Sequence, residues 1–359
     1  MGGCIGDKRG LAMFASWSIF ELLAAFALAA LMVLLTGMRI TRLVDTLADR
    51  TGIGEAIAGA VLLGAATSLS GTIVSITVAL DGFASMAYSN SIGGIAAQTA
   101  FLAIADLIYR KANLEHAAAD LANIFQAITL MVLLTLPLLA HTLPEISVFA
   151  IHPISLAIPV LYVGSLFVTR TMSQTPMWRP VKTRDTRKDT PEDESEGTLF
   201  KSTSRIFLDF VILMLVMGIS GWVIAKTAGA ITTRLAISET LVGALATAVT
   251  TSLPELVTTI AAVRRRALQL AVGGIIGGNT FDTLFLTAAD VSYRDGSLYH
   301  AAGVGDQFWN LIALLMTAIL LGGLILRQPT GPARMGGESL ALLAVYAGAI
   351  TLQVAPGLF

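Results

Sequence analysis

Charged residues are scarce in this sequence. Only 13% of its 359 residues are Asp, Glu, Lys or Arg, while 55% are hydrophobic and the mean hydropathy is +0.76. A soluble domain carries roughly 25% charged residues. A water-soluble fold of this length has no interior large enough to hide so much apolar surface, so the composition predicts an integral membrane protein.

Cysteine and basic charge are also in short supply. Cys4 is the single cysteine, which excludes an intrachain disulfide framework and a multi-cysteine metal site. The formal net charge is −1, so no overall basic field favours a nucleic-acid partner.

Long runs of apolar residues dominate the sequence. A membrane-spanning helix needs about 20 mainly apolar residues. Ten such runs can be placed, near 11–37, 54–80, 83–105, 121–140, 146–168, 206–226, 238–263, 267–290, 307–326 and 339–356. No lysine or arginine falls inside them away from the ends, whereas four carboxylates do: Glu21, Asp209, Glu255 and Asp282. We therefore expect an all-α membrane protein with ten transmembrane helices.

The positions of the Lys and Arg residues predict the orientation of these helices. Of the 23 basic residues, 18 fall in the connections on the side of the 169–205 loop and five on the other side. Because basic loops stay in the cytoplasm, the 169–205 loop is predicted to be cytoplasmic and both termini to lie outside. An Arg-rich amphipathic leader is absent, which favours a plasma membrane.

A single break in composition divides the chain. Residues 170–205 are polar and rich in both charges, with a cluster of acidic residues at 192–196. The segment is too short for a globular domain and is typical of a solvated linker; weak binding of a divalent ion by its acidic cluster is the alternative. We expect a five-helix half at 1–169, a cytoplasmic linker at 170–205 and a second five-helix half at 206–359.

The two halves contain an internal repeat. A shift of 184 residues aligns 55–110 with 239–294 without a gap and gives 18 identities in 56 positions. The most distinctive matches are Thr-Ser-Leu at 67 and 251, Gly-Gly at 93 and 277, and Asp-x-x-Tyr-Arg at 106 and 290. Since each half has five predicted spans, an odd number, the second half enters the membrane upside down. Such inverted repeats are usual in secondary transporters, whose sites lie where broken helices meet near the bilayer midplane.

One helix face in the seventh predicted span carries the strongest site signal. Ala248, Thr251, Ser252 and Glu255 are spaced i, i+3, i+4 and i+7, so they share a face. They offer a carbonyl, two hydroxyls and a carboxylate, which are hard oxygen ligands suited to Na⁺ or Ca²⁺. Asp282, in the eighth span, adds a second carboxylate. Each carboxylate is costly in a bilayer unless it is paired, protonated or bound to an ion.

The motifs around this face resemble the second α-repeat of the cation/Ca²⁺ exchanger superfamily, which includes the Na⁺/Ca²⁺ exchangers. The chain reads Thr-Ser-Leu-Pro-Glu at 251–255 and Gly-Gly-Ile-Ile-Gly-Gly-Asn-Thr-Phe-Asp at 273–282. The family pattern is roughly G-[ST]-S-x-P-E, followed by G-N-x-x-G-S-N-x-x-[ND]. The second repeat is a specific match and the first is degenerate. The resemblance implies ten helices in two inverted repeats and cation antiport by alternating access.

The resemblance also implies a set of cation-binding residues. Glu255 and Asp282 are the expected metal ligands. The other expected groups are hydroxyls, backbone carbonyls and one amide, which belong to Thr251, Ser252, Ala248, Thr67, Ser68, Gly64 and Gln98.

The first repeat departs from the family pattern. The family's first-repeat glutamate falls on Gly71, the proline before it on Ser70, and its third-span asparagine on Gln98. Gly94 and Gly278 stand where serine is usual. Two carboxylates therefore remain where exchangers of the family typically have three. Two negative charges balance one Ca²⁺, or two monovalent ions or protons, so we expect altered stoichiometry or selectivity, with electroneutral exchange as the hypothesis.

Two other functions are alternatives. The missing carboxylate is compatible with a degenerate exchanger that acts as a cation leak or sensor. Ser220 lies in a Gly-x-Ser-Gly sequence like that of intramembrane serine proteases, but such an enzyme needs a histidine at the same depth. The four histidines fall in predicted loops or at span ends, and no H-E-x-x-H zinc motif exists.

The function predicted from the sequence is therefore secondary active antiport, with calcium or another cation exchanged against sodium or protons, and not an enzymatic activity. The expected partners are inorganic cations and membrane lipids. No resident cofactor is expected, and the oligomeric state is left open.

Overall fold

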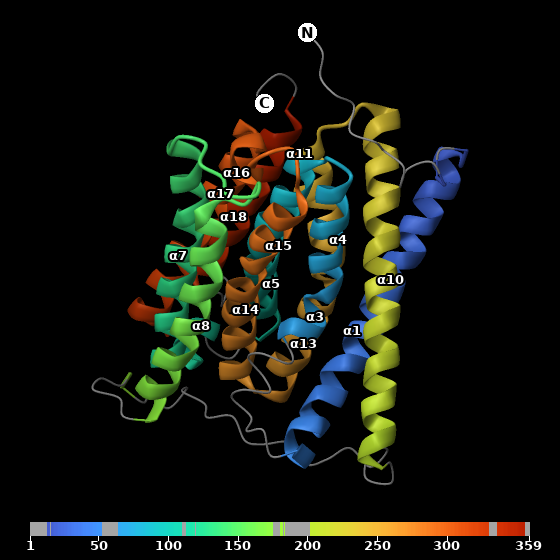
Figure 1. Cartoon of the computed structure of the whole chain (residues 1–359). Coiled ribbons are helices and arrows are strands. Elements are labelled where there is room, and N and C mark those ends of the chain that lie inside the picture. The colour runs from blue at the N-terminus through green and yellow to red at the C-terminus, as the bar shows by residue number, and fades with distance from the viewer. Residues whose placement is uncertain are drawn as a thin grey trace.

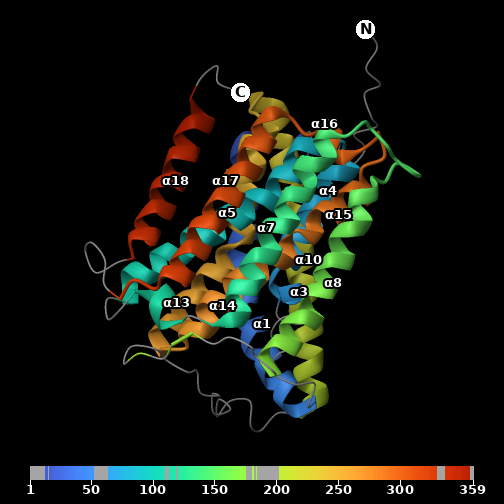
Figure 2. The ribbon, with the colours of Figure 1, turned by 90° about the vertical axis from the view of Figure 1, so that its left-hand side faces the viewer.

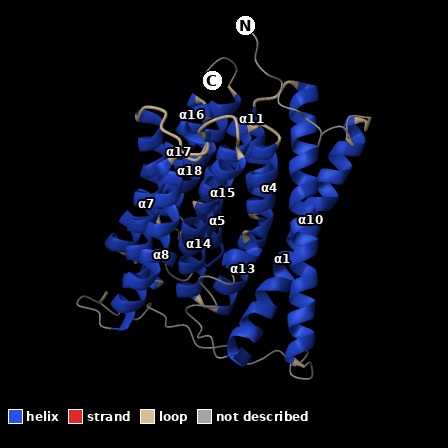
Figure 3. Ribbon diagram, in the orientation of Figure 1, coloured by secondary structure: helices blue, strands red, loops and turns tan. Residues whose placement is uncertain are grey.

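The computed structural model describes residues 13–355, except residue 15 and the segments 52–63, 110–112, 119, 175–179, 182, 184–201 and 330–335. The described residues form helices and contain no extended strand (Figure 3). The helices are α1 (Ile19–Thr51), α3 (Gly64–Thr67), α4 (Leu69–Leu80), α5 (Ala84–Tyr109), α6 (Leu114–Ala117), α7 (Leu121–Thr142), α8 (Pro153–Gln174), α10 (Thr203–Leu235), α11 (Glu239–Leu241), the π-helix η3 (Val242–Thr247), α12 (Ala248–Thr251), α13 (Leu253–Arg265), α14 (Leu268–Asp282), α15 (Leu284–Ser292), α16 (Leu298–Ala301), α17 (Val304–Leu326) and α18 (Gly337–Val354).

Seven of these helices are long and apolar enough to cross a membrane: α1, α5, α7, α8, α10, α17 and α18. The run from α11 to α13 passes the same test as a pair bent by 45° at a short break. The predicted all-helical class is confirmed. The described helices do not establish the predicted count of ten. Residues 54–63 of the second predicted span lie outside the described residues, and the eighth predicted span (267–290) is divided into the shorter helices α14 and α15.

Helix α5 is central and helix α1 is peripheral. In their most apolar windows, 83% of the residues of α5 are buried, against 22% in α1 and 28% in α10. The outer helices expose large apolar side chains, such as Phe20 on α1 and Leu215 on α10, which are 81% and 62% exposed. Apolar side chains facing outward are what a helix in contact with lipid requires.

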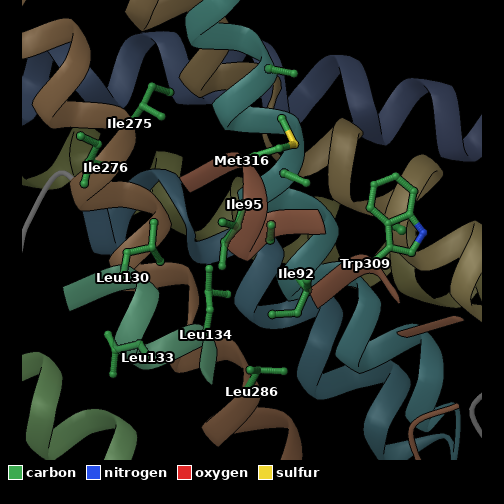
Figure 4. Packing of buried hydrophobic residues seen from close by; sticks show 14 of the residues in the cluster. Ile92, Ile95, Leu130, Leu133, Leu134, Ile275, Ile276, Leu286, Trp309 and Met316 are labelled. Carbon is green, nitrogen blue, oxygen red and sulfur yellow. The ribbon is translucent and has the colours of Figure 1, made fainter. Parts of the chain in front are cut away.

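The helices form a single bundle around α5. Helices α1 and α10 pack along each other at one edge, and α7 and α8 pair at the opposite edge (Figure 1). Figure 2 shows α18 beside α17, and both of these helices contact α5. Apolar side chains from α5, α7, α14, α15 and α17 meet inside the bundle (Figure 4).

Glycine permits a close contact between α5 and η3 in this core. A Cβ atom on Gly93 of α5 would lie 2.5 Å from the Ala244 Cα of η3, and a Cβ on Gly243 would lie 2.0 Å from the Ser89 Oγ. Only a residue without a side chain fits at either position. Small residues commonly allow membrane helices to approach closely. Here the close approach of α5 and η3 brings Gln98, further along α5, next to the break between α12 and α13.

Two buried aspartates join the halves of the chain through matching hydrogen bonds. The Asp106 carboxylate accepts from the backbone N–H groups of Leu114 and Gly336, at 2.8 and 3.0 Å. The Asp290 carboxylate accepts from the backbone N–H of Leu298 at 2.9 Å and that of His152 at 2.8 Å. Asp290 lies 184 positions after Asp106 and Leu298 lies 184 after Leu114, the offset of the internal repeat. Asp106 thereby ties α5 to the start of α18, and Asp290 ties α15 to the start of α8.

Several predicted boundaries are wrong. The first span was predicted at 11–37, whereas α1 begins at Ile19 and continues to Thr51. The sixth was predicted at 206–226, with Lys226 counted among the basic residues of the connections, but α10 continues to Leu235. Lys226 therefore lies within the helix, where its ammonium donates to both Asp81 carboxylate oxygens at 2.8 and 2.7 Å. This ion pair compensates the cost of the buried charge. Cys4 and most of the predicted linker at 170–205 lie outside the described residues.

Another buried carboxylate lies in α6. Glu115 is fully buried, one of its carboxylate oxygens has no hydrogen-bond partner, and the other accepts from the Ser339 hydroxyl at 3.4 Å. Burial raises the pKa of Glu115 well above its ordinary value, and the nearby carboxylates of Asp106 and Glu338 raise it further. Burial therefore favours the neutral form of Glu115 over its charged form.

Both aspartates are expected to contribute to stability. Replacing Asp106 or Asp290 with Ala leaves two backbone N–H groups without their acceptor, which costs about 1–3 kcal/mol for each buried unsatisfied group. Thermal unfolding of the detergent-solubilised protein measures the loss. The exposed Asp295→Ala variant is the matched control and should unfold like the wild type. An unchanged melting temperature in either buried variant would contradict this account.

Glu115 should make stability depend on pH. Its pKa is raised in the folded protein, so the stabilisation is complete at low pH and is lost as the pH rises through the folded-state pKa. The expected result is that Tm falls as the pH rises above the ordinary titration range of a glutamate carboxyl in the wild type, and falls less in Glu115→Gln. An identical Tm–pH profile for the two proteins would show that Glu115 does not carry the effect.

Candidate functional site

The Asp282 carboxylate lies where the two halves of the chain meet. It is the last residue of α14, is 2% exposed, and accepts hydrogen bonds on both oxygens. Ser68 Oγ donates to Oδ1 at 2.6 Å and Gln98 Nε2 donates to Oδ2 at 2.7 Å. Both donors come from the first half of the chain. Two predicted site residues more than 180 positions from Asp282 are thus brought into direct contact with it.

Ser252 completes a crossed arrangement. The Gln98 amide also donates to Ser252 Oγ at 3.2 Å. Ser252 is the repeat equivalent of Ser68, and Asp282 is the repeat equivalent of Gln98, each 184 positions later. Ser68 of the first repeat contacts Asp282 of the second, and Ser252 of the second contacts Gln98 of the first. Four predicted site residues (Ser68, Gln98, Ser252 and Asp282) therefore form one continuous polar network inside the apolar core.

Helix breaks place this network. Helix α3 ends at Thr67 and α4 begins at Leu69, so that Ser68 stands between them; likewise Ser252 stands between α12 and α13. Pro254 occupies the first turn of α13, where the absence of a proline N–H is tolerated. Thr283 separates α14 from α15. A break turns local backbone out of the regular helix and lets the side chains at that point face inward.

Glu255 lies in the first turn of α13, beside this network. It is 8% exposed. Thr67, at the end of α3, donates its hydroxyl to the Gly64 carbonyl at 3.4 Å. The Glu255 Oε2 atom is buried and has no partner. An unpaired carboxylate oxygen in an apolar interior is costly and therefore marks a position for a bound cation or a proton.

The remaining predicted groups, two backbone carbonyls and one hydroxyl, belong to the broken helices. The Gly64 carbonyl accepts from the Ser68 N–H at 3.0 Å, and the Ala248 carbonyl accepts from the Ser252 N–H at 3.1 Å. The Thr251 hydroxyl donates to the Thr247 carbonyl at 3.0 Å. These groups line the same two breaks, but their hydrogen bonds in this structure are made within their own helices.

Sequence reasoning missed Ser91 of α5. Its hydroxyl donates to the Asp282 backbone carbonyl at 2.7 Å, which satisfies a carbonyl at the end of α14. Asn90, next to it, donates to the Gly71 carbonyl at 3.1 Å. The signal was the polar run Ser89-Asn90-Ser91 in a helix that is otherwise apolar and buried, where polar side chains need partners.

Several buried oxygens in this region have no hydrogen-bond partner. They belong to a carboxylate, three amides and a hydroxyl: Glu255 Oε2, Gln98 Oε1, Asn90 Oδ1, Asn279 Oδ1 and Ser70 Oγ. Within the described part of the chain, no group of three or more His, Cys, Asp or Glu side chains could hold a metal ion. The donor set is instead two carboxylates with neutral oxygens, which is suited to a hard cation and unsuited to a soft one.

Ser220 does not resemble a nucleophile. Its hydroxyl donates to the Val216 carbonyl of its own helix at 2.8 Å. The histidines bond elsewhere, His116 to the Arg327 carbonyl and His141 to the Tyr299 carbonyl. No base is positioned to accept its proton in the described residues, as serine catalysis requires.

The fold and part of the sequence are similar to those of known proteins. One similar structure is that of the sodium–calcium exchanger NCX_Mj soaked with Na⁺ and Sr²⁺. The alignment includes 93% of this chain and 99% of the exchanger chain, with a TM-score of 0.60 and 16% sequence identity. The H⁺/Ca²⁺ exchanger CAX covers 93% and 85%, with a TM-score of 0.63 and 14% identity. At such identities the likeness concerns the fold alone.

Sequence comparison adds two matches. The inner membrane protein YrbG of Escherichia coli (strain K12) is 32% identical over 114 residues, which span 32% of this chain and 35% of that protein. The sodium/calcium exchanger protein family matches at residues 21–170 and 206–355. These two stretches take in most of both halves of the chain, so this protein belongs to the sodium/calcium exchanger protein family.

Proposed function

We propose that this protein is a secondary active antiporter that exchanges Ca²⁺ against Na⁺ or H⁺. The observation that carries the proposal is the buried network at the helix breaks, where Asp282 is held by donors from the other half and Glu255 keeps an unpaired oxygen beside it. Membership in the sodium/calcium exchanger protein family supports transport rather than enzymatic catalysis.

Glu255 and Asp282 are the proposed principal cation ligands. Neutral oxygens complete the coordination sphere: the side chains of Thr67, Ser68, Gln98, Thr251 and Ser252, and the carbonyls of Gly64 and Ala248. Two carboxylates balance one Ca²⁺ or two monovalent cations, so the exchange is electroneutral. Release of the transported cation leaves both carboxylates buried, which favours prompt binding of the counter-ion or of protons.

The proposed transport cycle is alternating access in ten helices arranged as two inverted five-helix repeats. The matching hydrogen bonds of Asp106 and Asp290, at opposite ends of the bundle, support this arrangement. The site residues stand near the middle of the broken helices, where transporters of inverted-repeat architecture place their substrates. Helices α1 and α10, which pair at the edge of the bundle, are the elements proposed to slide (Figure 1).

The proposed location is the plasma membrane, with both termini outside and the 169–205 connection in the cytoplasm. The distribution of basic residues supports this orientation. Helix α8 ends and α10 begins at the same end of the bundle (Figure 1), as that connection requires. Cations and the surrounding lipids are the proposed partners.

A cation leak or sensor is the second candidate, because Gly71 leaves the first repeat without a carboxylate. A leak moves Ca²⁺ down its own gradient with no dependence on Na⁺ or pH, whereas an antiporter requires the opposing gradient.

Calcium uptake should depend on Glu255. We expect proteoliposomes of the purified protein to accumulate ⁴⁵Ca²⁺ when an outward Na⁺ gradient or a pH gradient is imposed. In Glu255→Gln the uptake should fall by about 100-fold or more, since even residues outside the first ligand shell cost about 10–100-fold. Glu239→Gln, which changes the other glutamate of this helix run, is the control and should retain uptake. Uptake in Glu255→Gln at the wild-type rate would remove Glu255 from the site.

Gln98 should position the Asp282 carboxylate. Gln98→Ala removes a charge-assisted hydrogen bond of 2.7 Å, so the KM for Ca²⁺ should rise about tenfold. Gln353→Ala is a matched control, because Gln353 is another buried glutamine and accepts from Trp309 Nε1 away from this network. An equal rise of KM in both variants would show a general loss of packing rather than a role in the site.

A further inference from the structure

Positions 71 and 255 are equivalent in the internal repeat but differ in chemistry. Glu255 lies 184 residues after Gly71. Glu255 presents a buried carboxylate with a free oxygen at the second helix break. Gly71 is buried in the first turn of α4, three residues after the equivalent break at Ser68, and has no side chain at all. The site is therefore asymmetric by one carboxylate.

The space that a side chain at position 71 would enter is filled by an aromatic ring. A Cβ atom built on Gly71 lies 2.6 Å from Phe285 Cε2 and 3.1 Å from Phe285 Cζ. Real Cβ contacts essentially never fall below 3.0 Å. A glutamate at position 71 would need room for four more heavy atoms beyond this Cβ, so it fits only if the Phe285 ring moves.

The Phe285 ring is held in place by its neighbours. It is 4% exposed and packs edge-to-face on Phe281, with ring centroids 6.5 Å apart at 81°. Phe281 in turn packs on Tyr162, with centroids 5.9 Å apart at 82°. Edge-to-face pairs of this kind favour one ring orientation. These contacts favour the ring orientation that covers Gly71.

Polar atoms of the first repeat remain near this ring. The Gly71 carbonyl accepts from Asn90 Nδ2, which also donates to Ser75 Oγ at 2.9 Å. The Asn90 Oδ1 and Ser70 Oγ atoms are buried and have no partner. The first repeat thus keeps neutral oxygens near a position that lacks the negative charge of its counterpart.

We propose that Phe285 determines how many cations the site holds, by occupying the space that a carboxylate at position 71 would need. This inference rests on the proposed antiport function and identifies the residue that limits the site to two carboxylates. Gly71 and Phe285 form a coupled pair: a carboxylate at 71 requires a smaller side chain at 285. With both changes the site carries three negative charges, and one cycle moves one more elementary charge than in the wild type.

Four variants test this coupling: Gly71→Glu, Phe285→Ala, the double variant Gly71→Glu/Phe285→Ala, and Gly71→Glu/Phe101→Ala. Phe101 is the repeat equivalent of Phe285 and is also buried, so it controls for the loss of a core phenylalanine. The measurements are Tm in detergent, the Ca²⁺ concentration at which Tm rises half-maximally, and the reversal potential of Ca²⁺ flux in proteoliposomes.

Gly71→Glu alone should lower Tm by about 5 °C, because overpacking strains a buried core. Removing the Phe285 ring from that variant should restore Tm. It should also lower the half-maximal Ca²⁺ concentration about tenfold relative to the wild type, since the number of ligand charges tunes affinity. The reversal potential should shift by the equivalent of one charge per cycle. The Phe101 control should show none of these recoveries.

Three results would overturn the proposal: Gly71→Glu with wild-type Tm and transport, a Phe101 control that recovers as well as the Phe285 double variant, or a double variant with wild-type Ca²⁺ affinity and charge movement. If the double variant does not fold, Gly71→Asp/Phe285→Leu changes less volume and is judged by the same criteria. Failure of the wild type to transport under either gradient overturns the proposed function instead, and the Tm and Ca²⁺-affinity comparisons still decide the role of Phe285.

Discussion

A carboxylate buried in an apolar bundle must be surrounded by hydrogen-bond donors, and this constraint organises the centre of the protein. Asp282 obtains its donors from Ser68 and Gln98, both in the other half of the chain. Those donors reach it only because α3 and α4 are interrupted at Ser68 and because α5 runs through the middle of the bundle. Association of the two halves and formation of the site are therefore one structural event.

The same principle operates at both ends of the bundle. Asp106 and Asp290 accept backbone N–H groups at the starts of α18 and α8 and so satisfy helix ends that have no intrahelical acceptor. Each aspartate bonds to a helix from the opposite half. The polar groups of this membrane protein thus act as specific connections between halves, whereas apolar packing fills the volume between them. The duplicated pattern departs from symmetry at Gly71 and Glu255, where the substrate chemistry is proposed to lie.

Much of this could be predicted from the sequence, and the errors have physical causes. The helical class, the repeat offset and the inclusion of Ser68, Gln98, Ser252 and Asp282 in one set follow from apolar runs, self-similarity and motif resemblance. The end of α10 could not be predicted, because Lys226 reads as a boundary unless its partner Asp81, far away in sequence, is known. Ser91 was missed because a serine in an apolar helix most often bonds its own backbone. That it instead bonds the end of α14 depends on the packing of two helices.

The sequence by itself determined that this protein lies in a membrane, that it is helical, and which residue types are available to bind a cation. These features follow from hydropathy and residue spacing, which are local properties of the chain. The tertiary structure alone decided which of those residues touch. Ser68 and Asp282 are 214 positions apart and share a hydrogen bond of 2.6 Å. Only the folded arrangement shows that Phe285 fills the space beside Gly71, because the volume available to a side chain is set by neighbours that no local pattern identifies.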